Sequence, residues 1–213
     1  MPDTPLTSLP AGAFARHDEA PDDEFYRFER LVTHIDHAAV AAVTQLYRQL
    51  FPAGGTILDL MSSWVSHLPA EVAYTRVVGL GMNEVELARN PRLSEHVVRN
   101  LNQNPSLPYG DQEFDGAGIC VSVQYLTQPV AVFTELARVL RPGAPLVVTF
   151  SNRCFPDKAV YAWQALDDSG HVGLVKHYFA EAGFGPAEVY AHRPKHGDPL
   201  YGIVARRPST PNS

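Results

Sequence analysis

The apolar positions of the chain follow two periods, which alternate from residue 36 to residue 205. Short apolar runs, such as those at 56–61 and 145–151, are typical of strands that are buried on both faces of a sheet. Longer stretches, such as 36–50, repeat apolar residues at three- and four-residue spacing, as the buried face of a helix does. This alternation of strand and helix predicts a mostly parallel sheet that carries helices on both faces and is linked by right-handed crossovers.

Polar residues, glycines and prolines mark where these elements begin and end. Asp36 is placed to cap the first long helix, and Asn83 followed by Glu86 has the spacing of a capping pair. The last two strands are close enough in sequence to pair as an antiparallel hairpin at the edge of the sheet. We expect strands at 56–61, 76–80, 97–101, 114–123, 145–151, 187–192 and 200–205, and helices at 36–50, 66–74, 83–90, 130–140, 158–166 and 172–182.

The length and composition predict one domain with short extensions. A chain of 213 residues can bury one sizeable core, and we expect a single domain at 31–207. Residues 1–30 begin with a polar stretch that contains several prolines, which predicts a mobile N-terminal arm or strap. Its aromatic end at 25–28 is expected to dock on the domain, because three rings in four residues need burial. Residues 208–213 are expected to form a disordered tail.

Charge and cysteine content exclude several classes of partner. The formal net charge is −6, from 17 basic and 23 acidic residues, and no cluster of Lys and Arg would attract nucleic acid. Cys120 and Cys154 fit reduced thiols better than a disulfide framework, which favours a cytoplasmic setting. No apolar stretch has the length that spans a bilayer, so we expect no membrane partner. The sequence gives no indication of the oligomeric state.

Small and polar residues gather where the predicted parallel strands end. In an open α/β sheet, ligands bind outside the carboxyl ends of the strands. The sequence therefore predicts a ligand site at that edge, built from the segments 61–64, 81–83, 100–102, 122–125 and 151–153.

Five motifs in order carry a resemblance to a known family. They are Ile-Leu-Asp-Leu at 57–60, Val-Val-Gly-Leu at 77–80, the segment from 100 to 109, Phe-Asp at 114–115, and Glu-Leu-Ala-Arg-Val-Leu-Arg-Pro-Gly at 135–143. With these motifs, residues 31–205 resemble the class I S-adenosylmethionine-dependent methyltransferases, in a divergent type-11-like branch with unassigned substrate. The resemblance implies a three-layer, doubly wound, Rossmann-like sheet of seven strands with an antiparallel C-terminal hairpin. It also implies S-adenosyl-L-methionine as cofactor and a small-molecule acceptor.

The chain departs from the family pattern at its most typical loop. The family has glycines where this chain has Met61, Ser63 and Val65, and glycine there allows a positive φ and a close approach of the backbone to the cofactor. Gly81 occupies the place of the acidic residue that usually holds the ribose hydroxyls, and Asn100 replaces the acidic residue near the adenine. We therefore expect a cofactor pocket rebuilt from hydroxyl and amide side chains.

The resemblance, together with the strand ends, assigns candidate residues to three roles. Tyr125 and His34 are the candidate catalytic residues. The candidate substrate-binding residues are Trp64, Gln124, Tyr125, Asn152, Arg153 and His37. The candidate cofactor-binding residues are Asp59, Met61, Ser62, Ser63, Gly79, Gly81, Met82, Asn83, Asn100, Leu101, Ser122 and Val123.

Four candidates in or beside the loop after the first strand also have a structural alternative. Asp59 could bind the amino group of the methionine moiety or cap the loop that follows it. Ser62 and Ser63 could bind the cofactor carboxylate or start a helix at Ser66. Trp64 could stack on a ligand or cover the core.

The candidates on the acceptor side also have more than one possible role. Tyr125 fits positioning better than proton abstraction, because an ordinary phenol has a pKa near 10. The pair at 152–153 could clamp an anionic group, or Arg153 could pair with an acidic neighbour at the surface. The cluster of His34, Asp36 and His37 fits a helix cap or a lid better than a metal site, so we expect no metal.

Two other functions compete with methyl transfer. Loss of the glycines and of the ribose carboxylate favours a binding or regulatory module that kept the fold without the activity. A nicotinamide-dependent dehydrogenase is a weaker alternative, because no Gly-x-Gly-x-x-Gly motif follows the first strand.

Overall fold

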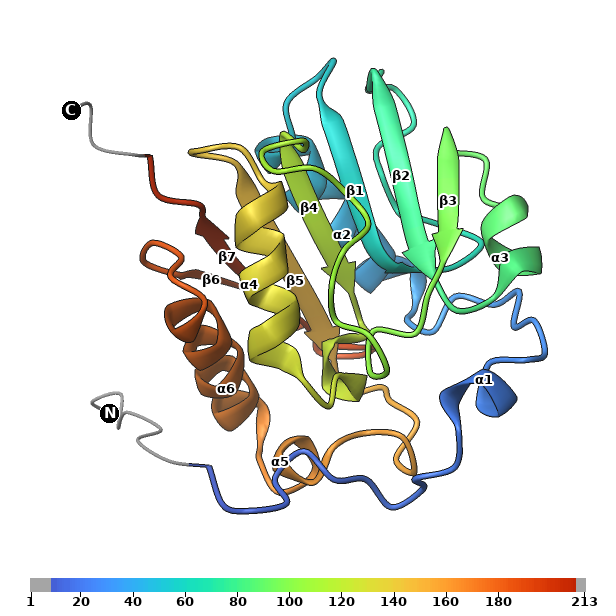
Figure 1. Ribbon diagram of the computed structural model, residues 1–213, viewed down its shortest axis with the longest axis vertical. Coiled ribbons are helices and arrows are strands. Elements are labelled where there is room, and N and C mark those ends of the chain that lie inside the picture. Colours follow the sequence, from blue (N-terminus) through green and yellow to red (C-terminus); the bar gives the residue numbers. More distant parts are fainter. Residues whose placement is uncertain (1–8, 210–213) are drawn as a thin grey trace.

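A seven-stranded sheet forms the centre of the computed structural model, which describes residues 9–209 (Figure 1). The order of the strands is β3-β2-β1-β4-β5-β7-β6, with β1 to β5 parallel and β7 antiparallel to both β5 and β6. The strands are β1 (Thr56–Ser62), β2 (Arg76–Gly81), β3 (Glu95–Val98), β4 (Gly116–Cys120), β5 (Pro145–Ser151), β6 (Glu188–His192) and β7 (Leu200–Arg206).

Helices cover both faces of this sheet, which makes three layers. Helix α2 lies on one face and α4 and α6 lie on the other, whereas α3 packs at the edge near β2 and β3 (Figure 1). The fold class predicted from the sequence, including the antiparallel C-terminal hairpin, is confirmed. The helices are α1 (Asp22–Phe25), α2 (His37–Leu50), α3 (Glu84–Ala88), α4 (Pro129–Val139), α5 (Tyr161–Gln164) and α6 (Asp168–Glu181), with a short 3-10 turn at Val123–Tyr125.

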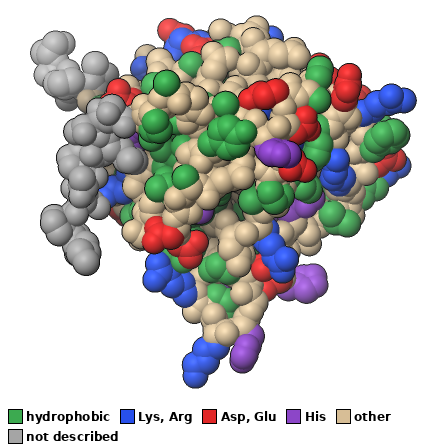
Figure 2. Space-filling model, turned by 90° about the horizontal axis from the view of Figure 1, so that it is seen from below, with side chains coloured by type: hydrophobic (Ala, Val, Ile, Leu, Met, Phe, Trp, Pro, Cys, Tyr) green, Lys and Arg blue, Asp and Glu red, His purple; other side chains and the backbone are tan. Residues whose placement is uncertain are grey.

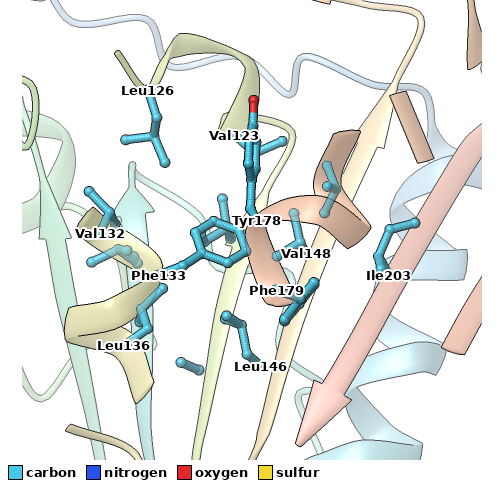
Figure 3. Close-up of a cluster of buried hydrophobic side chains, with 14 of the residues drawn as sticks. Val123, Leu126, Val132, Phe133, Leu136, Leu146, Val148, Tyr178, Phe179 and Ile203 are labelled. Carbon is cyan, nitrogen blue, oxygen red and sulfur yellow. The ribbon is translucent and has the colours of Figure 1, made fainter. Parts of the chain in front are cut away.

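The larger of two apolar clusters lies between the sheet and the helices α4 and α6. Phe133 on α4 meets Tyr178 and Phe179 on α6 edge to face, above Leu146 and Val148 of β5 (Figure 3). All five side chains are almost completely buried. Because apolar burial is the main stabilising contribution to a fold, this cluster fixes the central strands and so the position of their carboxyl ends.

Several element boundaries differ from the prediction, each for a local reason. No helix forms at 66–74, because His67 adopts a positive φ of 52° and Asn90 satisfies the preceding loop by donating to the Ser66 hydroxyl. Strand β3 begins two residues and ends three residues earlier than expected, since Glu95 pairs with Val78. Strand β4 ends at Cys120, where the next residue has a positive φ. The short helix α5 replaces a longer predicted helix, and α6 starts earlier because Asp167 caps it.

Residues 9–30, here called the roof segment, run along the edge of the molecule where β1 to β5 end (Figure 1). Ala13 and Ala15 accept backbone hydrogen bonds of 2.8 and 2.9 Å from Ala162 and Tyr161 of the segment after β5. The amide of Asp18 donates to the carbonyl of Asp157 at 2.9 Å. The roof segment is therefore attached to the domain by backbone pairing. Residues 1–8 of the predicted arm and 210–213 of the predicted tail lie outside the described residues.

Within residues 9–209, every helix is too short or too polar to cross a lipid bilayer.

Candidate functional site

A cavity of about 330 Å³ lies at the carboxyl ends of the central strands, beneath the roof segment. Its position is the one that the strand ends predict for a ligand site. Figure 2 views the molecule from this side, where basic and acidic side chains are interspersed without a large area of one sign. The lining residues include Arg16, Asp22, Tyr26, Arg30, His34, Met61, Ser62, Ser63, Gly81, Met82, Asn83, Glu86, Arg99, Asn100, Leu101, Asn102, Val121, Ser122, Tyr125, Arg153, Cys154 and Phe155.

The carboxyl end of β1 has a backbone conformation typical of glycine at a residue that is not glycine. Met61 has a φ of 56°, in the left-handed region that disfavours side chains, and it lines the cavity. The pairing of β1 with β2 shifts at this point, so that Ser62 lies opposite Gly81. A Cβ on Gly81 would lie 2.2 Å from the Ser62 carbonyl oxygen. The bulge in β1 therefore excludes an acidic side chain at position 81.

Hydroxyl and carboxylate groups connect this loop to α3 and to the segment that follows α1. The Ser63 hydroxyl donates to the Glu86 carboxylate at 2.7 Å, and the other oxygen of Glu86 accepts from the Arg30 amide at 2.6 Å. Asn83 caps α3 by accepting from the Glu86 amide, as predicted, and donates to the Tyr26 carbonyl at 2.9 Å. Glu86, which the sequence suggested only as part of a capping pair, thus joins three segments at the cavity wall.

Asp59 lies behind the cavity wall and does not line it. Its carboxylate is buried and accepts a 2.5 Å hydrogen bond from the Ser62 hydroxyl. Burial raises the pKa of Asp59 to about 6, although hydrogen bonds from Ser62 and Ser66 act in the opposite direction. The structure thus places Asp59 in the loop-supporting position that was the structural alternative to cofactor contact.

The raised pKa of Asp59 predicts a pH-dependent stability. In the unfolded chain this carboxyl titrates near its ordinary value of about 3.9, so between roughly pH 4 and 6 the folded state binds more protons. The free energy of unfolding should therefore fall by about 3 kcal/mol as the pH rises through that window. Asp59→Asn should lose this component and be more stable than the wild type at pH 7.5. Urea unfolding of both proteins at several pH values measures the difference. The same pH dependence of the free energy of unfolding in both proteins would contradict the prediction.

Tyr125 and His34 both line the cavity and both contact the ring of Phe155. The Tyr125 hydroxyl accepts from the Phe155 amide at 2.9 Å, and the two rings stack at 5.9 Å. Burial raises the pKa of Tyr125 to about 12, which fits positioning and not proton abstraction. The imidazole of His34 meets Phe155 edge to face at 5.3 Å, and partial burial lowers its pKa.

Several predicted site residues do not line the cavity. Trp64 donates to the Val32 carbonyl at 3.1 Å, and Gln124 turns back to donate to Val121. Arg153 lines the cavity but is ion-paired with Asp198 at 2.8 Å, which matches its structural alternative. The predicted residues outside the lining are Asp59, Trp64, Gly79, Val123, Gln124, Asn152 and His37. The other predicted residues line it together.

A buried ionic cluster holds the roof segment over the cavity. Asp22 pairs with Arg16 at 2.7 Å and with Lys158 at 3.4 Å, and the side chains are 5%, 7% and 0% exposed. The Lys158 ammonium also donates to the Ala20 carbonyl at 2.7 Å, and Asn102 donates to the free oxygen of Asp22 at 2.9 Å. Sequence reasoning missed this cluster, because its members lie in a segment interpreted as a mobile arm and in a distant loop.

The backbone just after β4 is strained, and the hydroxyl of Ser122 next to it makes no hydrogen bond in the described chain. Val121 has a φ of 45°, which is rare for a β-branched residue and costs of the order of 1–3 kcal/mol. The next residue, Ser122, is 9% exposed, and its buried hydroxyl has no hydrogen-bond partner in the described chain. Backbone strain and unpaired buried groups concentrate at ligand sites, so this wall of the cavity is a candidate contact for a ligand.

The two cysteines differ in access. Both cysteines line the cavity, but Cys154 is exposed, whereas Cys120 on β4 lies next to Tyr47 and Thr149 and is only partly accessible, and burial raises its pKa to about 12. No group of three or more His, Cys, Asp and Glu side chains within residues 9–209 is arranged to hold a metal ion. Asp36 caps α2 and accepts from the Asp198 amide, and His37 begins that helix.

Comparisons with known sequences match part of the chain to methyltransferases. Residues 62–148 match a family model described as a methyltransferase domain. Over 115 residues, the sequence is 30% identical to methyltransferase GfsG of Streptomyces halstedii, which covers 49% of this chain and 41% of the relative. The chain spans less than half of the length of the curated relatives it matches.

Solved structures share the fold at low sequence identity. Phosphoethanolamine N-methyltransferase 2 of Haemonchus contortus, in complex with phosphomonomethylethanolamine and S-adenosylhomocysteine, has a TM-score of 0.59 at 12% identity, over 81% of this chain and 53% of that chain. The [4+2]-cyclase SpnF has a TM-score of 0.58 at 19% identity, over 79% of this chain and 81% of that chain. The shared fold thus occurs in proteins whose names describe different reactions.

Proposed function

The chain belongs to the class I S-adenosylmethionine-dependent methyltransferase superfamily, and from this premise we propose that it transfers a methyl group from S-adenosylmethionine to a small-molecule acceptor. The observation that carries the proposal is the cavity at the carboxyl ends of β1, β2 and β4, into which the left-handed turn at Met61 opens. Such a turn is what the family's glycines provide, and here the backbone retains it.

The residues around this turn fit the cofactor. Backbone groups at Met61 and Ser62 can meet the methionine part, and the unpartnered Ser122 hydroxyl offers a further hydrogen bond. Asn100, near the end of β3, accepts from the Asn102 amide and donates to Asp23, and its side-chain amide has a further donor and acceptor position that can serve the adenine. All of these residues line one cavity, as a single ligand in contact with several strand ends requires.

Glu86 replaces the missing ribose carboxylate in this proposal. Position 81 cannot carry a side chain, and Glu86 is the carboxylate that reaches the cavity from α3, just beyond β2. Each of its oxygens accepts one hydrogen bond, from Ser63 and from Arg30, and a carboxylate oxygen can accept another. The sugar hydroxyls of the cofactor would supply these additional donors.

The protein's contribution to the reaction is then positioning and exclusion of water. When bound, the cofactor supplies a methyl group on a sulfonium that is already activated for transfer. Tyr125 and Phe155 form a flat wall that orients an acceptor, and the roof segment keeps water out of the cavity. His34, neutral near pH 7 because its pKa is lowered, can take the proton that an acceptor hydroxyl or amine releases.

Calorimetric titration with S-adenosylhomocysteine tests the proposal. The wild type should bind with a Kd in the micromolar range, and Glu86→Gln should bind about tenfold more weakly, because a neutral amide accepts a weaker hydrogen bond. Glu84→Gln is the matched control, since Glu84 lies on the same helix, is exposed and pairs with His96. Equal affinity of the two variants would contradict the role of Glu86.

A binding or regulatory module remains the second candidate function. Two observations favour this module. Hydroxyl side chains with hydrogen bonds stand where the family has its glycine loop, and the same fold is found in a cyclase. Absence of heat with both S-adenosylmethionine and S-adenosylhomocysteine would support the module and overturn methyl transfer.

A further inference from the structure

The charges that line the cavity do not balance. Four arginines line it, at positions 16, 30, 99 and 153, against the two carboxylates Asp22 and Glu86. The whole chain carries a net charge of −6, so this excess of cations is local. In a hollow with low-dielectric walls, unpaired cations raise the local concentration of anionic ligands.

Two of the four arginines are neutralised and two are not. Arg16 pairs with Asp22, and Arg153 pairs with Asp198. Within residues 9–209, no carboxylate lies within ion-pair distance of the guanidinium of Arg30 or of Arg99. Arg99 directly follows β3, at the end of the cavity assigned above to the cofactor. Once Asp198 is counted, four arginines face the three carboxylates Asp22, Glu86 and Asp198, and the lining cation on the roof side that has no ion pair is Arg30.

Neighbouring groups hold the Arg30 guanidinium in place. It lies 4.5 Å from the centre of the Phe25 ring and 5.5 Å from that of Phe155, as a cation above aromatic faces. It donates to the carbonyls of Phe25 at 2.8 Å and Phe28 at 3.4 Å, and its amide is fixed by Glu86. A guanidinium carries five N–H donors, so three remain for a ligand.

The side chains beside this cation are flat. Tyr26, Tyr125, His34 and Phe155 all line the cavity together with Arg30. Tyr125 stacks on Phe155, and His34 meets the same ring edge to face. Stacking surfaces of this kind favour a planar, unsaturated ligand, which gains contact area over the whole of its face.

Resting on the proposed function, we propose that the acceptor is a planar aromatic or conjugated molecule with a carboxylate or phosphate group, and that Arg30 binds this anionic group. The planar donor fork of arginine matches the two oxygens of either group. The cofactor does not account for the charge, because its sulfonium and amino groups outweigh its one carboxylate. An anionic acceptor balances the cations of the cavity and those of the cofactor.

The test uses the 213-residue chain saturated with S-adenosylhomocysteine and three probes of similar size: benzoate, phenyl phosphate and the neutral benzamide. Calorimetric titration should show that benzoate or phenyl phosphate binds at least about tenfold more tightly than benzamide. Comparison of the two anions identifies which group the site prefers. In Arg30→Gln the preference for the anions should vanish. Equal binding of benzoate, phenyl phosphate and benzamide by the wild type would overturn the proposal.

Two further measurements separate this proposal from the proposed function. Arg89→Gln removes an exposed arginine of the same charge outside the cavity and should leave the anion preference unchanged. Arg30→Gln should bind S-adenosylhomocysteine as the wild type does. If that affinity falls in parallel with benzoate binding, Arg30 serves the cofactor carboxylate and the acceptor proposal is wrong. If the wild type binds no S-adenosylhomocysteine but still prefers the anions through Arg30, the anion site stands and methyl transfer fails.

Discussion

Gly81→Ala is expected to destabilise the fold by about 3 kcal/mol or more, one of the two largest effects predicted for a single substitution in this chain. The added methyl group would lie 2.2 Å from the carbonyl oxygen of Ser62, which is a backbone atom in the paired strand β1. Neither strand can move without breaking the register that joins β2 to β1 and β1 to β4. Urea unfolding followed by circular dichroism measures the loss.

The control for this prediction is a glycine in open space. A Cβ on Gly173 in α6 would meet no heavy atom within 4 Å. Gly173→Ala should therefore stabilise the protein by about 0.4–1 kcal/mol, because alanine loses less backbone entropy in a helix. A Gly81→Ala protein as stable as the wild type would show that the bulge in β1 is soft and that the missing acidic side chain has another cause.

Asp22→Asn is expected to detach the roof segment, at a cost of about 3 kcal/mol. The substitution removes the 2.7 Å partner of the buried Arg16 guanidinium, which keeps only a 3.6 Å contact with the exposed Glu19. Lys158, whose side chain is fully buried, loses its 3.4 Å contact with Asp22 and keeps Asp18 at 3.1 Å. A buried charge that loses its short, buried partner is much more costly than an exposed one. Hydrogen exchange should rise in residues 9–30 before it rises in the central strands.

Asp23→Asn provides the matched control for Asp22→Asn. Asp23 is exposed and makes only long hydrogen bonds, of 3.3 and 3.4 Å, with Asn100 and Gln103. Its substitution should change neither the exchange of residues 9–30 nor the unfolding midpoint. If Asp22→Asn also leaves the exchange of residues 9–30 at the wild-type rate, the backbone pairing with 157–162 holds the roof segment without the ionic cluster.

The fold was predictable because its determinants are local or periodic. Asp36 caps α2 and Asn83 caps α3 through hydrogen bonds within three residues, which spacing alone can suggest. The apolar runs predicted the positions of the central strands in the same way. The predicted helix at 66–74 failed because a side chain from a distant loop, Asn90, satisfies the backbone and hydroxyl groups there. No local pattern carries that information.

The candidate site was predictable only where strand ends supply it. The segments after β1, β2 and β3 and the hydroxyl of Ser122 line the cavity as expected. Arg16, Asp22 and Arg30 were missed because a proline-containing polar segment resembles a mobile arm, and only its partners across the fold make it ordered. Glu86 was visible as a helix-capping residue, but its contact with Ser63 depends on a turn that no spacing shows.

The sequence indicates that the end of β1 departs from the family pattern, but it does not show which backbone conformation replaces the glycines. Positions 61 and 81 depart from the family pattern in opposite directions: a side chain stands where the family has glycine, and glycine stands where the family has an acidic side chain. At Met61 the chain accepts a strained backbone and keeps a side chain, whereas at Gly81 it gives up a side chain so that the β1 carbonyl can approach. The sequence alone shows that both positions differ from the family pattern. The register between β1 and β2, which places Ser62 opposite Gly81, explains why the two differences occur together.

The contrast between the two thiols makes the native protein suitable for selective labelling. Both line the cavity and burial raises the pKa of both, but Cys154 is exposed, whereas Cys120 is only partly accessible and its pKa rises to about 12; the sequence contains no other cysteine. Since thiolates are the species that react with maleimides, a fluorophore attached to the unmodified chain will be found on Cys154. Its emission then reports occupancy of the cavity without any engineered residue.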